Sequence, residues 1–133
     1  MNGKEILIDT NIIIYLLDGS DTLAEVLQGK NIFLSFITEL ELIGYKGITN
    51  KQQEQIEELL GDCSVISMNN FIKDRYIQIR KKYSFKLAYT LIAATSLAFD
   101  IPLLTADIGF KKISGLRLIT YQHEIKLADS SKD

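Results

Sequence analysis

The chain has 133 residues, the length of one domain, and a formal net charge of −2 at pH 7. Apolar residues make up 47% and charged residues 24%, which excludes a disordered chain, and the near-neutral balance excludes a strongly basic protein that coats nucleic acid. A single cysteine, Cys63, excludes an internal disulfide framework, and a single histidine, His123, excludes a zinc motif built on two histidines.

The sequence has no run approaching the roughly 18 consecutive apolar residues that a membrane span requires. Its N-terminus also lacks the apolar core of a signal peptide. We therefore expect a cytoplasmic protein without membrane contact. We expect one domain over residues 1–126, followed by a frayed tail over residues 127–133.

Short apolar runs alternate with helical segments along the chain. We expect strands at residues 5–8, 32–35, 64–66, 102–105 and 116–120. We expect helices at residues 10–17, 23–27, 37–45, from 49 onward, 71–82 and 87–99. Strands separated by helices pair in parallel through right-handed crossovers. The order therefore predicts an α/β fold, with a parallel sheet of about five strands and helices on both faces.

Local signals fix several helix ends and one helix environment. Asp18-Gly19 is typical of a helix C-terminus, and Thr49 with Gln52 has the spacing of a capping box. The segment 87–99 is apolar almost all round, which predicts a helix buried on more than one side.

Two of the expected strands end in an acid, Asp9 after the first and Asp107 after the fourth. Ligands of an open parallel sheet bind at the carboxyl ends of its strands, where the strand order reverses. If these strands are neighbours, the two carboxylates meet in one crevice. For Asp9 the alternative is a helix N-cap, since a helical segment follows.

Glu41 is a third acidic candidate, on the helix after the second strand. Its alternative role is structural, because Thr38 and Glu41 have the spacing of a capping box. The other familiar sites are missing, since the sequence has neither a Gly-rich phosphate loop nor a dinucleotide fingerprint.

The charge is divided unevenly along the chain. Residues 1–69 carry 11 acidic and 4 basic side chains, whereas residues 70–133 carry 6 acidic and 11 basic ones. The basic side chains of one expected helix are Lys73, Arg75, Arg80, Lys81 and Lys82. They form either an ordinary solvated helix face or a surface that binds RNA.

Four segments, in this order, resemble the motifs of PIN-domain nucleases, and of VapC-type toxins in particular. They are Asp9-Thr10-Asn11, the segment 35–42 with Glu41 at its acidic position, the segment 91–95, and Leu103-Leu104-Thr105-Ala106-Asp107. The resemblance covers nearly the whole chain. Any one of these motifs is weak, but four at matching spacing are specific.

The resemblance implies a PIN-like three-layer α/β/α sandwich with an acidic pocket for Mg²⁺ or Mn²⁺. In it Asp9 and Asp107 would hold the metal, Glu41 would complete the catalytic set, and Asn11 and Thr105 would give polar support. VapC-type proteins are endoribonucleases that are silenced by a small antitoxin protein and commonly form homodimers. Hard divalent ions prefer such oxygen ligands.

Two positions depart from the family pattern. Tyr89 stands where the third motif normally has an acid, and Gly109 replaces a second acid before Phe110. A neutral phenol is a poor ligand for Mg²⁺, so we expect weak metal binding and Tyr89 beside Asp9 and Asp107. The alternative is a catalytically inactive PIN fold that binds RNA or protein. A CheY-like signalling domain is disfavoured, because such domains cluster two acids at the first strand, where Asp9 stands alone.

Overall fold

The computed structural model describes residues 3–122, which form one five-stranded parallel sheet in the order β3-β2-β1-β4-β5. The strands are β1 (Glu5–Ile8), β2 (Asn31–Ser35), β3 (Ser64–Ile66), β4 (Leu103–Thr105) and β5 (Leu118–Thr120). The helices are α1 (Thr10–Leu17), α2 (Asp21–Leu27), α3 (Phe36–Ile43), α4 (Asn50–Asp62), α5 (Asn70–Lys82), α6 (Leu87–Phe99) and the 3₁₀ helix η1 (Ile108–Lys112). The expected α/β class, parallel sheet and element order are confirmed.

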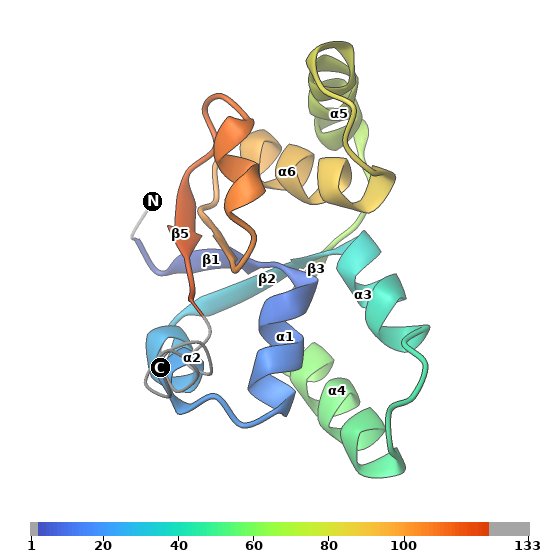
Figure 1. The fold of residues 1–133 in the computed structure, drawn as a ribbon, viewed down its shortest axis with the longest axis vertical. Coiled ribbons are helices and arrows are strands. Elements are labelled where there is room, and N and C mark those ends of the chain that lie inside the picture. The colour runs from blue at the N-terminus through green and yellow to red at the C-terminus, as the bar shows by residue number, and fades with distance from the viewer. Residues whose placement is uncertain (1–2, 123–133) are drawn as a thin grey trace, which may run out of the picture.

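Helices cover both faces of the sheet, α5 and α6 on one side and α1, α2 and α4 on the other (Figure 1). The alternation of side chains along each strand divides the core in the same way. Leu7 and Leu103 pack with α5 and α6, whereas Ile6, Ile8 and Leu104 pack with α1, α2 and α4. These three layers make the expected sandwich.

The helix caps explain two differences from the expected boundaries. The Ser20 side chain accepts a hydrogen bond from the backbone N–H of Leu23, so α2 begins at Asp21. The Ser35 side chain accepts one from the backbone N–H of Ile37, so α3 begins at Phe36. A capping box at Thr38 is therefore wrong, because the position of the cap is three residues earlier.

Two other local expectations are confirmed. The Thr49 and Gln52 side chains each accept a hydrogen bond from the other's backbone N–H, which is a complete capping box at the start of α4. Residues 90–96 of α6 are all buried, as the apolar character of the segment predicts.

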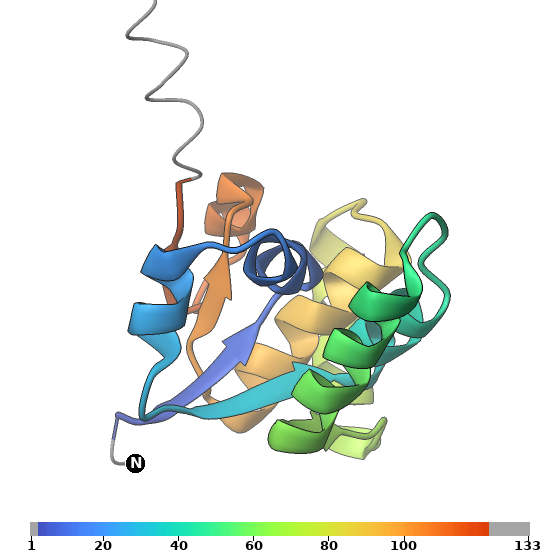
Figure 2. The ribbon, with the colours of Figure 1, turned by 90° about the horizontal axis from the view of Figure 1, so that it is seen from below.

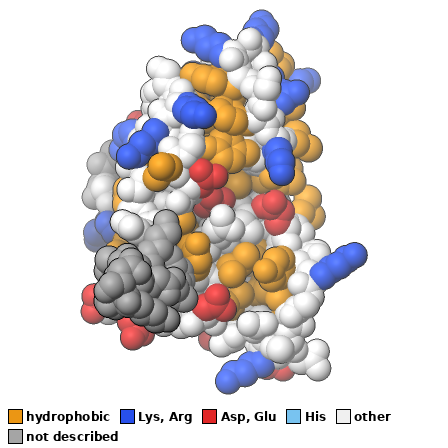
Figure 3. Space-filling model, in the orientation of Figure 1, with side chains coloured by type: hydrophobic (Ala, Val, Ile, Leu, Met, Phe, Trp, Pro, Cys, Tyr) orange, Lys and Arg blue, Asp and Glu red, His pale blue; other side chains and the backbone are white. Residues whose placement is uncertain are grey.

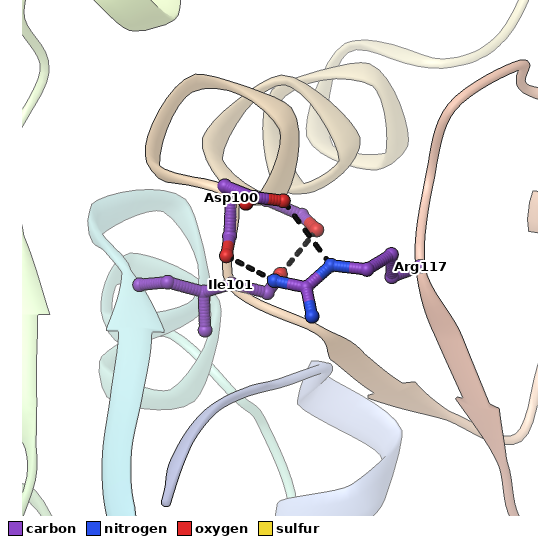
Figure 4. Close-up of polar contacts among 4 residues, drawn as sticks. Asp100, Ile101 and Arg117 are labelled. Carbon is purple, nitrogen blue, oxygen red and sulfur yellow. Dashed lines mark hydrogen bonds and ion pairs between the residues drawn. The ribbon is translucent and has the colours of Figure 1, made fainter. Parts of the chain in front are cut away.

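The turn from α6 into β4 is held by polar contacts with Arg117, just before β5. Asp100 ends α6 in the left-handed region, at φ 52°. Arg117 donates from Nε to the Asp100 carboxylate over 3.1 Å and from Nη2 to its backbone oxygen (Figure 4). These contacts stabilise a backbone conformation that is rare outside glycine.

The strand order reverses between β1 and β4. From β1 the chain moves outward through β2 to β3, and it returns to the other side of β1 to form β4 and β5. Figure 2 shows β1 and β2 running side by side in the same direction. Because β1 also pairs with β4, Asp9 and Asp107 follow neighbouring strands at the same edge of the sheet.

No helix within residues 3–122 is long and apolar enough to cross a membrane. His123 and the expected tail over residues 127–133 lie outside the described residues.

Candidate functional site

The carboxyl ends of β1 and β4 open into a cavity of about 490 Å³. Five of the residues singled out in the sequence line it: Asp9, Asn11, Glu41, Tyr89 and Asp107. Figure 3 shows acidic side chains in the middle of this face of the molecule. The cavity thus gathers residues from α1, α3, α6 and the segment after β4.

Asp9 is both the N-cap of α1 and part of the acidic cavity, so its two interpretations hold together. It follows β1 directly and is only 7% exposed. Its Oδ1 accepts a hydrogen bond from the backbone N–H of Thr10 over 2.8 Å, and its Oδ2 accepts one from the Thr105 hydroxyl over 2.7 Å. These bonds fix the orientation of the carboxylate.

Thr105 connects the two acids that follow the strands. Its hydroxyl donates to Asp9 and accepts a hydrogen bond from the backbone N–H of Asp107 over 3.0 Å. The Asp107 carboxylate in turn accepts one from the backbone N–H of Gly109 over 2.8 Å. Thr105 is fully buried, which makes it a rigid support between Asp9 and Asp107.

Glu41 is an exposed acid of α3 that lines the same cavity as Asp9 and Asp107. Its Oε1 accepts a hydrogen bond from the Thr10 hydroxyl over 2.6 Å. Within residues 3–122, no three or more His, Cys, Asp or Glu side chains converge closely enough to hold a metal ion. All three acids line one cavity and the charge of Glu41 raises the pKa of Asp9, whereas the expectation that the three carboxylates lie within a few ångströms of one another stays a prediction. Glu41 is held by the Thr10 hydroxyl, and Asp9 and Asp107 are linked through the Thr105 hydroxyl.

The acids of the cavity repel one another electrostatically. Burial raises the pKa of Asp9 above its ordinary value, and the charges of Glu41 and Asp107 raise that pKa further. The hydrogen bonds from Thr105 and Thr10 act in the opposite direction. In the described part of the chain, no Lys or Arg forms an ion pair with any of these acids.

This donor set fits a hard divalent cation. Mg²⁺ keeps several waters and takes only one or two carboxylates from a protein, and Asp9 and Asp107 supply two. A cation would also compensate the charges that raise the pKa of Asp9. Asp9 and Asp107 are therefore the residues that could hold a metal.

Tyr89 lies in the wall of the same cavity, on the first turn of α6. Its ring stacks on that of Phe110, with centroids 3.8 Å apart and an interplanar angle of 3°. Burial, together with the charges of Asp107 and then Asp9, raises the pKa of Tyr89 to about 12. The phenol therefore lies near both acids and stays neutral at physiological pH.

The absence of a side chain at Gly109 makes room for Tyr89. A β-carbon placed on Gly109 would lie 2.8 Å from the Tyr89 hydroxyl oxygen and 3.0 Å from Asp107 Oδ1. Gly109 is not in the left-handed region, so its backbone alone does not require glycine. The two departures from the family pattern therefore depend on each other, because the Tyr89 hydroxyl occupies the space that a side chain at position 109 would need.

The expected RNA-binding residues of α5 lie elsewhere. Lys73, Arg75, Arg80, Lys81 and Lys82 are all exposed, and none of them lines the acidic cavity. Arg80 donates to the backbone oxygen of Phe85 over 2.7 Å, and Arg75 and Lys82 line a separate cavity of about 430 Å³.

The structure adds three residues to the site that the sequence did not assign to it. Thr10 positions Glu41, and two exposed lysines, Lys46 after α3 and Lys86 before α6, line the acidic cavity. Thr10 sits within the first motif, and Lys86 belongs to the basic stretch before α6. Nothing in the sequence marks Lys46, because it reaches the site only through the turn after α3.

The comparisons with known proteins agree with this fold. The sequence matches the model of the PIN domain family over residues 6–116, and the chain belongs to this family. No curated protein matches the sequence.

The chain also resembles several solved structures. A chain of a toxin–antitoxin complex from Klebsiella pneumoniae is 28% identical, with a TM-score of 0.74, and the match covers 89% of this chain and 99% of that one. A chain in the structure of VapBC-1 from nontypeable Haemophilus influenzae is 27% identical, with a TM-score of 0.70, over 87% of this chain and 97% of that one. A chain of VapBC2 from Rickettsia felis, bound to a DNA fragment from its promoter, has a TM-score of 0.79 at 22% identity, over 89% and 99%. This last likeness shows the fold alone.

Proposed function

We propose that this PIN-domain protein is a VapC-like toxin, an endoribonuclease that depends on Mg²⁺ or Mn²⁺ and acts on RNA in the cytoplasm. The observation that carries the proposal is the pair of acids after β1 and β4, linked through the buried Thr105 hydroxyl at the reversal of strand order. The likeness to chains of toxin–antitoxin complexes supports it.

In this proposal the protein positions the reacting groups. Asp9 and Asp107 would hold the cation, whose chemistry there would be to lower the pKa of a water and to offset charge on the scissile phosphate. The Thr105 hydroxyl fixes the position of Asp9 relative to Asp107. Glu41, held by Thr10, orients the attacking water, and Asn11 gives polar support beside it.

The proposed partners are a small antitoxin protein and a second copy of the chain. The solved relatives are themselves toxin–antitoxin and VapBC structures, which supports the antitoxin. An exposed aromatic pair on α5 and α6 supports the homodimer. Phe71 is 69% exposed and contacts Phe99, with ring centroids 6.4 Å apart. Exposed apolar clusters of this kind mark interfaces.

The test of the proposed function is cleavage of structured RNA by the purified protein. Cleavage should require Mn²⁺ or Mg²⁺ and stop with EDTA. Asp107→Asn should lower the rate by at least about 10–100-fold. Asp74→Asn, an exposed acid of α5 outside the cavity, is the matched control and should cleave as the wild type does. Metal-independent cleavage, or cleavage unaffected by Asp107→Asn, contradicts the proposal.

A second candidate function is a catalytically inactive PIN fold that binds RNA or protein. Tyr89 favours it, because a neutral side chain stands in the acidic wall. Within residues 3–122 there is also no group of three or more His, Cys, Asp or Glu side chains that could hold a metal ion. Absence of cleavage under every metal condition, together with retained RNA binding, would establish this alternative.

A further inference from the structure

The acidic cavity has positive charge at its mouth as well as negative charge on its floor. Asp9, on the floor, is buried, whereas Lys46 and Lys86, from the turn after α3 and the turn before α6, are exposed. Among the described residues neither lysine forms an ion pair. Their charges are therefore free to bind an anion that enters the cavity.

Tyr89 adds a neutral hydrogen-bond donor to the same wall. Its hydroxyl has no hydrogen-bond partner in the described part of the chain, and it occupies the space over Gly109. The ring contacts both Phe110 and Phe85, at centroid distances of 3.8 Å and 4.8 Å, which restricts its motion. A carboxylate at this position would repel a phosphate, whereas a phenol O–H donates to one.

We propose that Lys46, Lys86 and Tyr89 bind a backbone phosphate of the RNA at the mouth of the cavity, and that the basic face of α5 does not. The inference deepens the proposed function and rests on it. The lysines attract the polyanion, and the Tyr89 hydroxyl donates to a phosphate oxygen. The departure at position 89 then exchanges a carboxylate, which repels RNA, for a group that binds it.

The cations of α5 are poorly placed for this role. Lys73 and Lys81 lie outside the cavity, and Arg80 is already engaged with the backbone of Phe85. Lys46 and Lys86, by contrast, line the same cavity as Asp9 and Asp107. Phosphate contacts position a nucleic acid without reading its sequence, so this surface gives affinity rather than base specificity.

The test is the affinity for a short fluorescein-labelled single-stranded RNA, measured by fluorescence anisotropy in EDTA so that no metal-dependent cleavage occurs. Lys46→Ala and Lys86→Ala should each weaken binding several-fold. Each should also reduce the slope of log K against log salt by about 0.7, as expected for loss of one phosphate contact on a single strand. Tyr89→Phe keeps the stacked ring and should weaken binding about tenfold, because it removes a hydrogen bond to a charged group.

Three matched lysine variants complete the design. Lys73→Ala and Lys81→Ala test the rival face on α5, and Lys51→Ala on α4 controls for net charge. All three should change the affinity by less than about twofold. Thermal melting verifies that each variant is folded.

The outcomes separate this inference from the proposed function. Loss of affinity in the α5 variants, with none in the Lys46, Lys86 and Tyr89 variants, overturns the inference even if the protein cleaves RNA. Loss confined to the three cavity variants upholds it even if no cleavage is found. A wild-type protein that does not bind the RNA overturns it as well.

Discussion

The contact between Tyr89 and Gly109 makes a quantitative prediction about stability. Gly109→Ala would place a β-carbon 2.8 Å from the Tyr89 hydroxyl oxygen, closer than folded proteins allow. The ring cannot swing away freely, because it stacks on Phe110 at 3.8 Å. Overpacking of this kind costs about 1–3 kcal/mol. The lower backbone entropy of alanine in the unfolded chain offsets about 0.4–1 kcal/mol of that cost.

The expected net cost of Gly109→Ala is therefore about 1–2 kcal/mol. At an unfolding entropy of about 2.1 cal/mol/K per residue, the chain of 133 residues should lose roughly 4–7 °C in Tm. Tyr89→Phe removes the hydroxyl and leaves only the contact of 3.0 Å with Asp107 Oδ1. In that background Gly109→Ala should cost less than about 0.5 kcal/mol, which gives a coupling energy of about 1 kcal/mol or more.

The assay is urea and thermal unfolding of the wild type, the two single variants and the double variant. Gly61→Ala is the matched control, because Gly61 lies within α4 with no atom near the added β-carbon. It should stabilise the protein by about 0.5–1 kcal/mol. An equal cost of Gly109→Ala in both backgrounds, or no cost in the wild type, would refute the argument that Tyr89 is fixed above Gly109.

Three further predictions concern the acids and the exposed aromatic pair. The pKa of Asp9 is raised in the folded protein, so its stabilising contribution is full below the ordinary value of 3.8 and is lost as the pH rises through the raised pKa. In metal-free urea unfolding, Asp9→Asn should therefore gain stability over the wild type as the pH increases. A gain that shrinks with rising pH would contradict the burial of the Asp9 charge. Tyr89→Asp adds a carboxylate beside Asp107 and Asp9, so it should bind Mn²⁺ more tightly than the wild type in calorimetric titration and melt at a lower temperature without metal. Equal Mn²⁺ affinity of the variant and the wild type would show that Tyr89 is not at a ligand position. Phe71→Ser should shift the protein from dimer to monomer in light scattering. Ile108→Ser, at an equally exposed position outside the Phe71–Phe99 pair, should leave the dimer intact. A dimer that persists in Phe71→Ser would place the interface elsewhere.

The elements of the fold could be predicted because each depends on local patterns. Alternation of short apolar runs with helical segments gave the parallel sheet, and the caps at Asp9 and Thr49 matched their helices. The cap of α3 was misjudged, because Ser35 and Thr38 are both good N-caps and only the end of β2 decides between them. A cap depends on where the preceding strand ends, and a single sequence marks that point poorly.

The site was predictable as a pair of strand-end acids but not as a three-dimensional arrangement. The pairing of β1 with β4 brings Asp9 and Asp107 to one edge, as neighbouring parallel strands must. The position of Glu41 depends on the Thr10 hydroxyl, and that of Lys46 depends on the turn after α3. The periodicity of apolar residues along the sequence predicts neither position. The basic helix α5 stood out by its charge, but charge density along a sequence does not say which cavity a side chain faces.

The central claim is that Asp9 and Asp107 hold a divalent cation at the reversal of strand order. Calorimetric titration of Mn²⁺ into the wild type, Asp107→Asn and the control Asp74→Asn tests it most directly. The account predicts one bound Mn²⁺ in the wild type and in Asp74→Asn, and a loss of at least about tenfold in affinity in Asp107→Asn. Equal Mn²⁺ binding by all three proteins, or no binding by the wild type at millimolar Mn²⁺, would contradict it.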